Sequence, residues 1–369
     1  MHRALTQVLA VGAVILASFT LTQEGTTTLL AQSNMLVVAS GLDNPRGLAF
    51  GPDGALWVAE AGRGGTGTTL CDVGGNGQPR CYGPTGAITR ITGLNVHNRI
   101  VTGLPSVAGA SGSDALGPAD IDFGFGSAWV TIGFGANPLN RSVYEAAGIR
   151  FGSLVRVTGI GQWSYALDIS DHEISSNPDK NQIDSNPFGL RVLSDRAIVA
   201  DAGANALLEI GQFGHTRTLA VFPRRTVGPA TIDAVPTSVT VGPGGAYFVG
   251  ELTGAPFPVG AAQIYRVPAN GGEPVVMAGG FTNIIDVDFD SVRNAFYVLE
   301  HDADGIIPPT GPGLNGKLTR IDTQTGARTV LASTDFPKPG GLAIGSDGAV
   351  YVTRRTGLAG LGDVVRIVP

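Results

Sequence analysis

Residues 45–60 read PRGLAFGPDGALWVAE, two short runs of alternating apolar residues joined by the turn sequence GPDG. Alternation with a period of two is typical of β-strands, and Gly, Pro and Asp tolerate the backbone angles of tight turns. The stretch therefore predicts a β-hairpin. Related stretches recur five more times along the chain, at 118–132, 187–201, 236–251, 284–300 and 339–353.

A third predicted strand follows each hairpin, and most copies carry an arginine before the final apolar residue. These strands lie at 86–91, 152–157, 206–210, 262–267, 316–321 and 362–367. A fourth strand follows only the first five copies, at 99–104, 164–169, 216–222, 274–281 and 327–333. A matching segment occurs instead before the first hairpin, at 35–42.

The repeats predict an all-β chain that forms a six-bladed β-propeller with four-stranded blades. The offset fourth strand predicts that the N-terminal strand, 35–42, closes the last blade. Such closure removes the unpaired sheet edges that expose all-β proteins to aggregation. We therefore expect a single propeller domain over 35–369.

Composition agrees with short strands and tight turns, and it excludes some partners. The chain of 369 residues contains 55 glycines and 23 prolines, and only 15% of its residues are charged. Its net charge is −6, without any run of Lys or Arg. A nucleic-acid surface would be basic and clustered, so neither nucleic acid nor an anionic membrane surface is an expected partner.

The N-terminus predicts export. A short basic start precedes the apolar run VLAVGAVILASF at 8–19, which is typical of a secretory signal peptide. We expect the signal to cover 1–31, with cleavage after Ala31 and a secreted or periplasmic product. Leu29 stands where a small residue is preferred, so an uncleaved N-terminal anchor is the alternative. No later segment is apolar for long enough to span a membrane.

Cys71 and Cys81 are the two cysteines of the chain. In an exported protein an even pair predicts one disulfide. A zinc site needs further ligands, and no histidine lies near this pair in the sequence.

The predicted connections differ between the two faces of the propeller. Turns within the hairpins are short, whereas connections from second to third strands are long, at 61–84, 133–150, 252–260, 301–315 and 354–361. Long connections on a rigid scaffold commonly carry binding residues. We therefore expect a small molecule or a protein partner to bind at this loop-rich face.

The hairpin ends that point to the loop-rich face carry eight polar residues that are candidate ligand-binding residues. They are Asn44, Asp120, Asn186 and Asn283 at strand starts, and Glu60, Asp201, Glu251 and Glu300 at strand ends. If they converge on the channel mouth, their oxygens suit Ca²⁺, and paired carboxylates suit acid–base catalysis. The alternative, which the sequence favours, is that they cap strand ends and bond to loop backbone.

The stretch NPDKNQID at 177–184 places side-chain oxygens at four positions and resembles part of a calcium loop. It lacks the glycine and the final glutamate of an EF-hand, so a solvated turn is the favoured interpretation. Zinc-hydrolase, nucleophile-elbow and dinucleotide-binding motifs are absent from the sequence.

Several longer runs resemble the ScyD/ScyE family of exported propeller proteins, which is named from scytonemin pigment biosynthesis in cyanobacteria. The most specific are GELTGAPFPVG at 250–260 and FTNIID at 281–286, and others lie at 41–65, 81–91 and 184–190. The resemblance covers essentially the whole chain after the signal and implies a propeller fold and export. It supplies no established catalytic residues. More distantly, the repeats are similar to NHL-repeat and gluconolactonase-like propellers.

Two classes of function follow from this sequence. The first is an exported binding or accessory protein that uses the loop-rich face. The alternative is a metal-dependent hydrolase or lactonase with a cation at the channel mouth. The catalytic residues of that alternative are unknown, and Ca²⁺ is the one cofactor that the sequence suggests.

Overall fold

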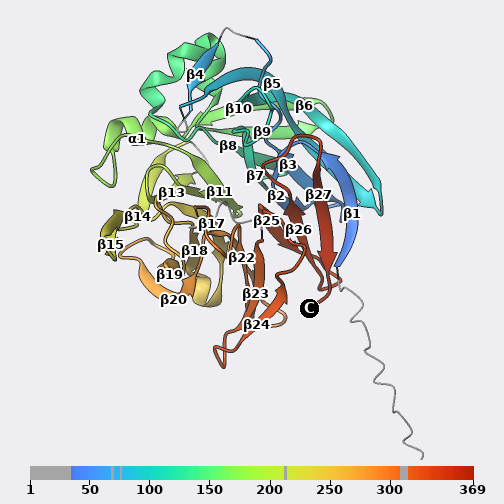
Figure 1. Ribbon diagram of the computed structural model, residues 1–369, viewed down its shortest axis with the longest axis vertical. Helices are drawn as coiled ribbons and strands as arrows, with labels where there is room; N and C mark the ends of the chain where they lie inside the picture. The colour runs from blue at the N-terminus through green and yellow to red at the C-terminus, as the bar shows by residue number, and fades with distance from the viewer. Residues whose placement is uncertain (1–34, 68–69, 75–76, 212–213, 308–314) are drawn as a thin grey trace, which may run out of the picture. The chain divides into compact units, whose positions relative to one another are not determined.

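The computed structural model describes residues 35–67, 70–74, 77–211, 214–307 and 315–369. The predicted signal peptide at 1–31 lies outside them. The described chain forms six antiparallel sheets that are the blades of a β-propeller (Figure 1). The predicted fold class is therefore confirmed.

Each blade begins with the hairpin that the repeats predict. Blade 1 contains β2 (Pro45–Phe50), β3 (Leu56–Glu60), β5 (Pro79–Gly93) and β6 (Val96–Ala108), with β4 (Cys71–Val73) paired to β5. Blade 2 contains β7 (Pro118–Gly124), β8 (Ser127–Ile132), β9 (Ser153–Gly159) and β10 (Gln162–Asp168). Blade 3 contains β11 (Pro187–Val192), β12 (Arg196–Asp201), β13 (Ala206–Gly211) and β14 (Thr216–Val221).

The other three blades follow the same order from the innermost strand outward. Blade 4 contains β17 (Pro236–Val241), β18 (Tyr247–Glu251), β19 (Ala262–Val267) and β20 (Val275–Phe281). Blade 5 contains β21 (Ile284–Asp290), β22 (Ala295–Glu300), β23 (Lys317–Asp322) and β24 (Arg328–Ala332). Blade 6 contains β25 (Gly341–Ile344), β26 (Val350–Arg354), β27 (Gly362–Ile367) and β1 (Met35–Leu42).

The connections hold the remaining elements. These are the 3-10 helices η1 (Pro138–Arg150) and η2 (Pro243–Gly245), the α-helix α1 (Ser170–Ser176) and a small ribbon of β15 (Arg225–Val227) and β16 (Ala230–Ile232). No helix in the described part of the chain is both long and apolar enough to cross a membrane.

Closure of the ring is as predicted. Strand β1 pairs antiparallel with β27, in a register that places Met35 opposite Ile367 and Leu42 opposite Gly362. In Figure 1 the blue N-terminal strand lies beside the red C-terminal strand. Both ends of the described chain therefore belong to one sheet, and the fourth strand of blade 6 comes from the start of the chain.

The hydrophobic core lies between neighbouring blades. Leu48 and Val58 of blade 1 pack in one cluster with Ala343 and Val364 of blade 6. Each blade thus buries the apolar side of its alternating strands against the next blade.

The innermost strands approach one another closely around the axis. A Cβ added at Gly341 would lie 2.8 Å from the Cα of Gly47, and one added at Gly189 would lie 2.6 Å from the Cα of Ser238. A Cβ at Gly47 would in turn lie 2.8 Å from the Cα of Asp120. Real Cβ atoms do not approach so closely. Gly47, Gly189 and Gly341 occupy equivalent positions in their innermost strands, so this position requires glycine in three of the six blades.

Candidate functional site

The eight predicted residues occupy the hairpin ends as expected, but their side chains do not meet at the axis. Strand pairing sets Pro45 opposite Glu60, Pro187 opposite Asp201, Pro236 opposite Glu251 and Ile284 opposite Glu300. Among the eight, Asp120 alone lines the axial cavity.

The three glutamates pair with basic side chains that come from outer strands of the same blade or, for Glu251, from the connection that precedes its blade. Glu60 forms a 2.7 Å ion pair with Arg99 of β6 and accepts a hydrogen bond from the Asp43 amide. Glu251 pairs with Arg225 of β15, and Glu300 lies 2.8 Å from the Nζ of Lys317. Each glutamate is fully buried, so each pair neutralises a charge that water does not reach.

The remaining candidates bond to nearby backbone. Asp201 accepts from the Asn186 amide at 2.7 Å and from the amides of Gly203 and Ala204 at 3.1 Å. The Asn44 Nδ2 donates to the carbonyls of Gly62 and Gly112. Asn186 accepts from the Phe134 amide, and Asn283 donates to the Leu252 carbonyl. These contacts are the capping role that the sequence favoured.

Among the described residues, no group of three or more His, Cys, Asp or Glu side chains is arranged to hold a metal ion. The calcium site at the eight hairpin-end residues stays a prediction.

A cavity with a volume of about 720 Å³ lies on the propeller axis. It is lined by side chains of the innermost strands and by short hairpin turns at 51–54, 290–293 and 345–348. The cavity therefore borders the short turns, the opposite face from the long connections that the sequence favoured. Along the axis its polar lining is Asp120, Asp122, Arg191, Asp286 and Asp288, and the short turns add Asp290, Ser291, Arg293, Ser346 and Asp347.

Asp120 and Asp286 join neighbouring blades at the base of this cavity. The Asp120 Oδ2 accepts a 2.8 Å hydrogen bond from the Leu190 amide of blade 3, and the Asp286 Oδ2 accepts one of 2.8 Å from the Leu342 amide of blade 6. Burial raises the pKa of Asp286 to about 7 and holds that of Asp120 well above its ordinary value. Both carboxyl groups therefore link neighbouring blades through these hydrogen bonds.

Arg191 lies between two further carboxylates, one from blade 2 and one from blade 5. Its guanidinium is 3.9 Å from the Asp122 Oδ2 and 3.5 Å from the Asp288 Oδ1. Asp288 also accepts a 2.7 Å hydrogen bond from the Thr240 hydroxyl. The Arg191 side chain is 34% exposed, so its charge is accessible from the cavity.

Sequence reasoning missed four of the five polar residues along the axis. A signal for two pairs is present, because the innermost strands of blades 2 and 5 both read D-x-D-F, as DIDF at 120–123 and DVDF at 286–289. Alternation points both aspartates of such a strand to the same side. In the first strand of a propeller blade, one of the two sides faces the propeller axis.

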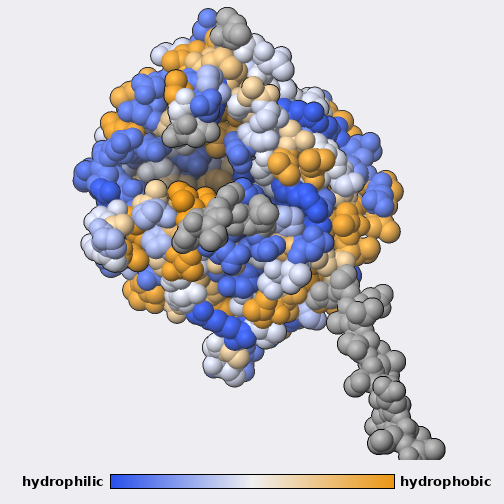
Figure 2. Space-filling view, in the orientation of Figure 1, coloured by the Kyte–Doolittle hydropathy of each residue, from blue (hydrophilic) through white to orange (hydrophobic). Residues whose placement is uncertain are grey.

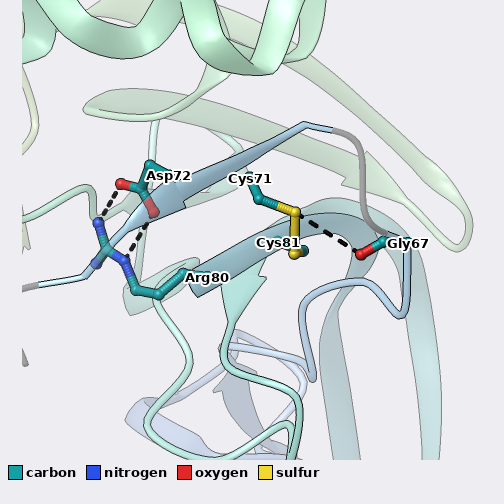
Figure 3. Close-up of a disulfide and its surroundings, with 5 residues drawn as sticks. All are labelled: Gly67, Cys71, Asp72, Arg80 and Cys81. Carbon is teal, nitrogen blue, oxygen red and sulfur yellow. Dashed lines mark hydrogen bonds and ion pairs between the residues drawn. A yellow bond between two sulfur atoms is a disulfide. The ribbon is translucent and has the colours of Figure 1, made fainter. Parts of the chain in front are cut away.

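The long connection of blade 1 carries the predicted disulfide. Cys71 and Cys81 face each other across the β4–β5 pair, with an S–S distance of 2.06 Å (Figure 3). Next to it, Arg80 forms a 2.6 Å ion pair with Asp72 across the same two strands. The disulfide and the ion pair together hold a ribbon of only three paired residues on each strand.

The surface turned to the viewer in Figure 2 is a mosaic of hydrophilic and hydrophobic residues, with a hollow near the middle of the view. Large exposed hydrophobic side chains, such as Leu94, Ile160 and Val292, are spread over separate blades. Scattered apolar residues of this kind are ordinary on a protein surface. They do not favour any one patch as a protein-docking surface.

No family model matches this chain, and no curated protein matches it. A Bacteroides thetaiotaomicron protein of unknown function is similar with a TM-score of 0.55 and 7% identity, over 90% of this chain and 75% of its own. The PQQ-bound aldose sugar dehydrogenase of Streptomyces coelicolor has a TM-score of 0.52 and 10% identity, over 90% and 97%. The calcium structure of a Trichoderma reesei protein of Carbohydrate-Active Enzymes Family AA12 has a TM-score of 0.50 and 11% identity, over 90% and 94%. At these identities the likeness shows the fold alone.

Proposed function

We propose that the protein is an exported, ScyD/ScyE-like β-propeller that binds a small polyhydroxylated molecule in its axial cavity. The observation that carries the proposal is the axial placement of Asp122, Arg191 and Asp288, which three different blades bring to one cavity of about 720 Å³. Cavities of roughly 300–1,000 Å³ are typical of small-molecule sites.

The polar lining suits hydroxyl groups. Carboxylate oxygens accept hydrogen bonds from hydroxyls, and a guanidinium donates to hydroxyl oxygens in a fixed fork. The three charged side chains alternate as acceptor, donor and acceptor around the axis. Phe50, Phe289 and Ile344 also border the cavity, and their side chains pack in the hydrophobic clusters between blades.

Export rests on two observations. The apolar run at 8–19 after a basic start supports a signal peptide. The Cys71–Cys81 disulfide supports an oxidising compartment. The ScyD/ScyE resemblance of 250–260 and 281–286 agrees with both.

Native mass spectrometry of the protein exported by its own host tests the proposal. We expect a small-molecule adduct in the native protein and in Arg156→Met, which changes an arginine on the outer surface of blade 2. We expect the adduct to be lost in Arg191→Met and in the near-isosteric Asp288→Asn.

If no adduct survives purification, melting is measured with glucose, sucrose and glycerol. A binder specific to the folded protein raises the melting temperature by mass action. No adduct together with no shift by any of these three probes would contradict the proposal, as would an adduct that persists in both cavity variants.

A further inference from the structure

An acidic cluster lies away from the axis, where α1 and the following loop pack against the end of β12. We define it as Glu173, Asp179, Asp184 and Asp201. The Glu173 Oε1 accepts a 3.3 Å hydrogen bond from the Asp184 amide, which joins the Glu173 side chain to the backbone at Asp184. A Cβ at Gly203 would lie 2.8 Å from the Asp184 Oδ1, so Asp184 also packs against the turn after β12.

The cluster has no basic partner among the described residues. None of its four carboxylates forms an ion pair there. The buried glutamates of blades 1, 4 and 5 differ, since Glu60, Glu251 and Glu300 each pair with an arginine or lysine. The chain supplies a cation for each of these three carboxylates, whereas none of the four carboxylates of the cluster has an ion pair among the described residues.

Two members of the cluster are already satisfied by hydrogen bonds. Asp179 accepts from the amide groups of Asn181 and Asn205, and Asp201 accepts from one hydroxyl and three backbone amides. These two residues supply negative charge but leave little room for a ligand.

The other two members keep an oxygen without a partner. Glu173 is 1% exposed, and its Oε2 has no hydrogen-bond partner. The Asp184 Oδ1 is likewise buried and without a partner, as is the Oδ1 of Asn177 at the end of α1. Burying a carboxylate oxygen without a hydrogen bond or a counter-charge is costly. The described residues therefore supply these oxygens with neither a hydrogen-bond donor nor a counter-charge.

We propose that Glu173 and Asp184 bind a divalent cation of the calcium type, with the Asn177 oxygen, backbone carbonyls and water completing its shell. Two carboxylates balance the double charge of the cation. Ca²⁺ accepts mixed carboxylate, amide, carbonyl and water oxygens in a flexible shell, whereas Mg²⁺ requires a near-ideal octahedron. The site would fasten α1 and its loop to blade 3.

Melting of the full-length exported protein tests the site. After EDTA treatment, we expect Ca²⁺ at about 5 mM to raise the melting temperature by roughly 3 °C or more at pH 8. Equilibrium dialysis should find bound Ca²⁺ in the native protein. Glu173→Gln and Asp184→Asn remove one charge each at nearly constant volume and should abolish the Ca²⁺ response.

The matched control is Asp171→Asn, which removes a carboxylate that is 72% exposed on the same helix. It should keep the full response to Ca²⁺. Glu173→Gln should also melt higher than the native protein in EDTA, because it relieves repulsion that no cation then offsets.

The Ca²⁺ response should depend on pH. Burial and then repulsion from Asp201, Asp179 and Asp184 raise the pKa of Glu173 to about 7. Burial and then repulsion from Asp201, Asp179 and Asp233 raise the pKa of Asp184 to about 6. Raised pKa values mean that the folded protein without the cation loses stability as pH rises through them. Ca²⁺ should therefore stabilise less at about pH 5.5 than at pH 8.

Equal melting of the native protein in EDTA and in Ca²⁺ at pH 8 would overturn the site. A Ca²⁺ response that persists in both Glu173→Gln and Asp184→Asn would place the cation elsewhere and would overturn it as well. The axial cavity contains neither residue, so failure here leaves the proposed ligand site unaffected.

Discussion

Among single residues, the three glutamates at the hairpin ends show how the fold neutralises buried charge. Glu60 is fully buried, and its partner Arg99 reaches it from a strand 39 residues later. The same arginine also contacts Asp43 at 3.0 Å. Arg99 therefore serves two carboxylates where the first hairpin meets the outer strand.

We expect Arg99→Met to destabilise the protein by about 1–3 kcal/mol, because it leaves Glu60 buried without its counter-charge. The partial exposure of Arg99 places the value below that of a fully buried pair. Arg217→Met is the matched control, since the Arg217 side chain is half exposed and Glu209 keeps its second partner, Arg196, so this pair should contribute less than about 1 kcal/mol. Urea unfolding measures both, and equal effects would contradict this assignment.

At the scale of elements, the six innermost strands must approach one another closely enough to close the axis. Gly47 makes this possible between blades 1 and 2, because a Cβ there would also lie 1.9 Å from the Asp120 Oδ1. Asp120 also lines the axial cavity. Packing at this position therefore links stability to the shape of the proposed site.

Gly47→Ala should lower the free energy of unfolding by about 1–3 kcal/mol, since the added methyl forces β2 and β7 apart. Gly93→Ala is the control, because the atoms nearest to its added Cβ lie 3.9 Å away at the end of β5. Thermal unfolding of the two variants compares them directly. A Gly47→Ala protein as stable as Gly93→Ala would refute close packing of the inner strands.

The β4–β5 ribbon is an element that depends on its disulfide. Each strand contributes three paired residues, which is too few for an independent hairpin. Replacing Cys71 and Cys81 together by Ala should cost roughly 2–3 kcal/mol and should increase amide exchange in the ribbon first.

Thiol titration of the exported protein under denaturing, non-reducing conditions should find no free cysteine. Two free thiols in material from the native host would contradict both the disulfide and the export proposal.

Elements that repeat could be predicted from the sequence, and elements that do not repeat could not. The hairpin at 45–60 has a period-two pattern and a GPDG turn, so it was identifiable alone, and five copies fixed the blade count. Strands β4, β15 and β16 are short and polar, and they carry no such pattern. Their place depends on a disulfide and on Arg225 reaching Glu251.

The candidate site was only partly predictable for a related reason. Sequence position placed Glu60, Glu251 and Glu300 at hairpin ends correctly. Sequence position alone does not predict that these side chains pair with basic residues from outer strands or connections and so lie away from the axis. Arg191 and Asp288, which do line the cavity, lie within strands whose alternation was interpreted only as a fold signal.

At the scale of the whole molecule, closure by β1 makes the propeller a continuous ring. Removing residues 1–42 should leave β27 as an open edge, and we expect aggregation or loss of cooperative unfolding. Removing only residues 1–34 keeps β1 and is the control, which should melt like the full chain. Calorimetry of the two truncations distinguishes them, and normal melting of the longer truncation would contradict closure by β1.

The proposed ligand site also depends on the closed ring, because the axial cavity exists only when six innermost strands surround it. The most direct measurement is a crystal structure of the protein purified from its exporting host without added ligand. Our account predicts density for a small molecule with hydroxyl groups in the axial cavity, within hydrogen-bond distance of Asp122, Arg191 and Asp288. A cavity that contains only water, with a co-purified molecule bound elsewhere on the propeller, would contradict it.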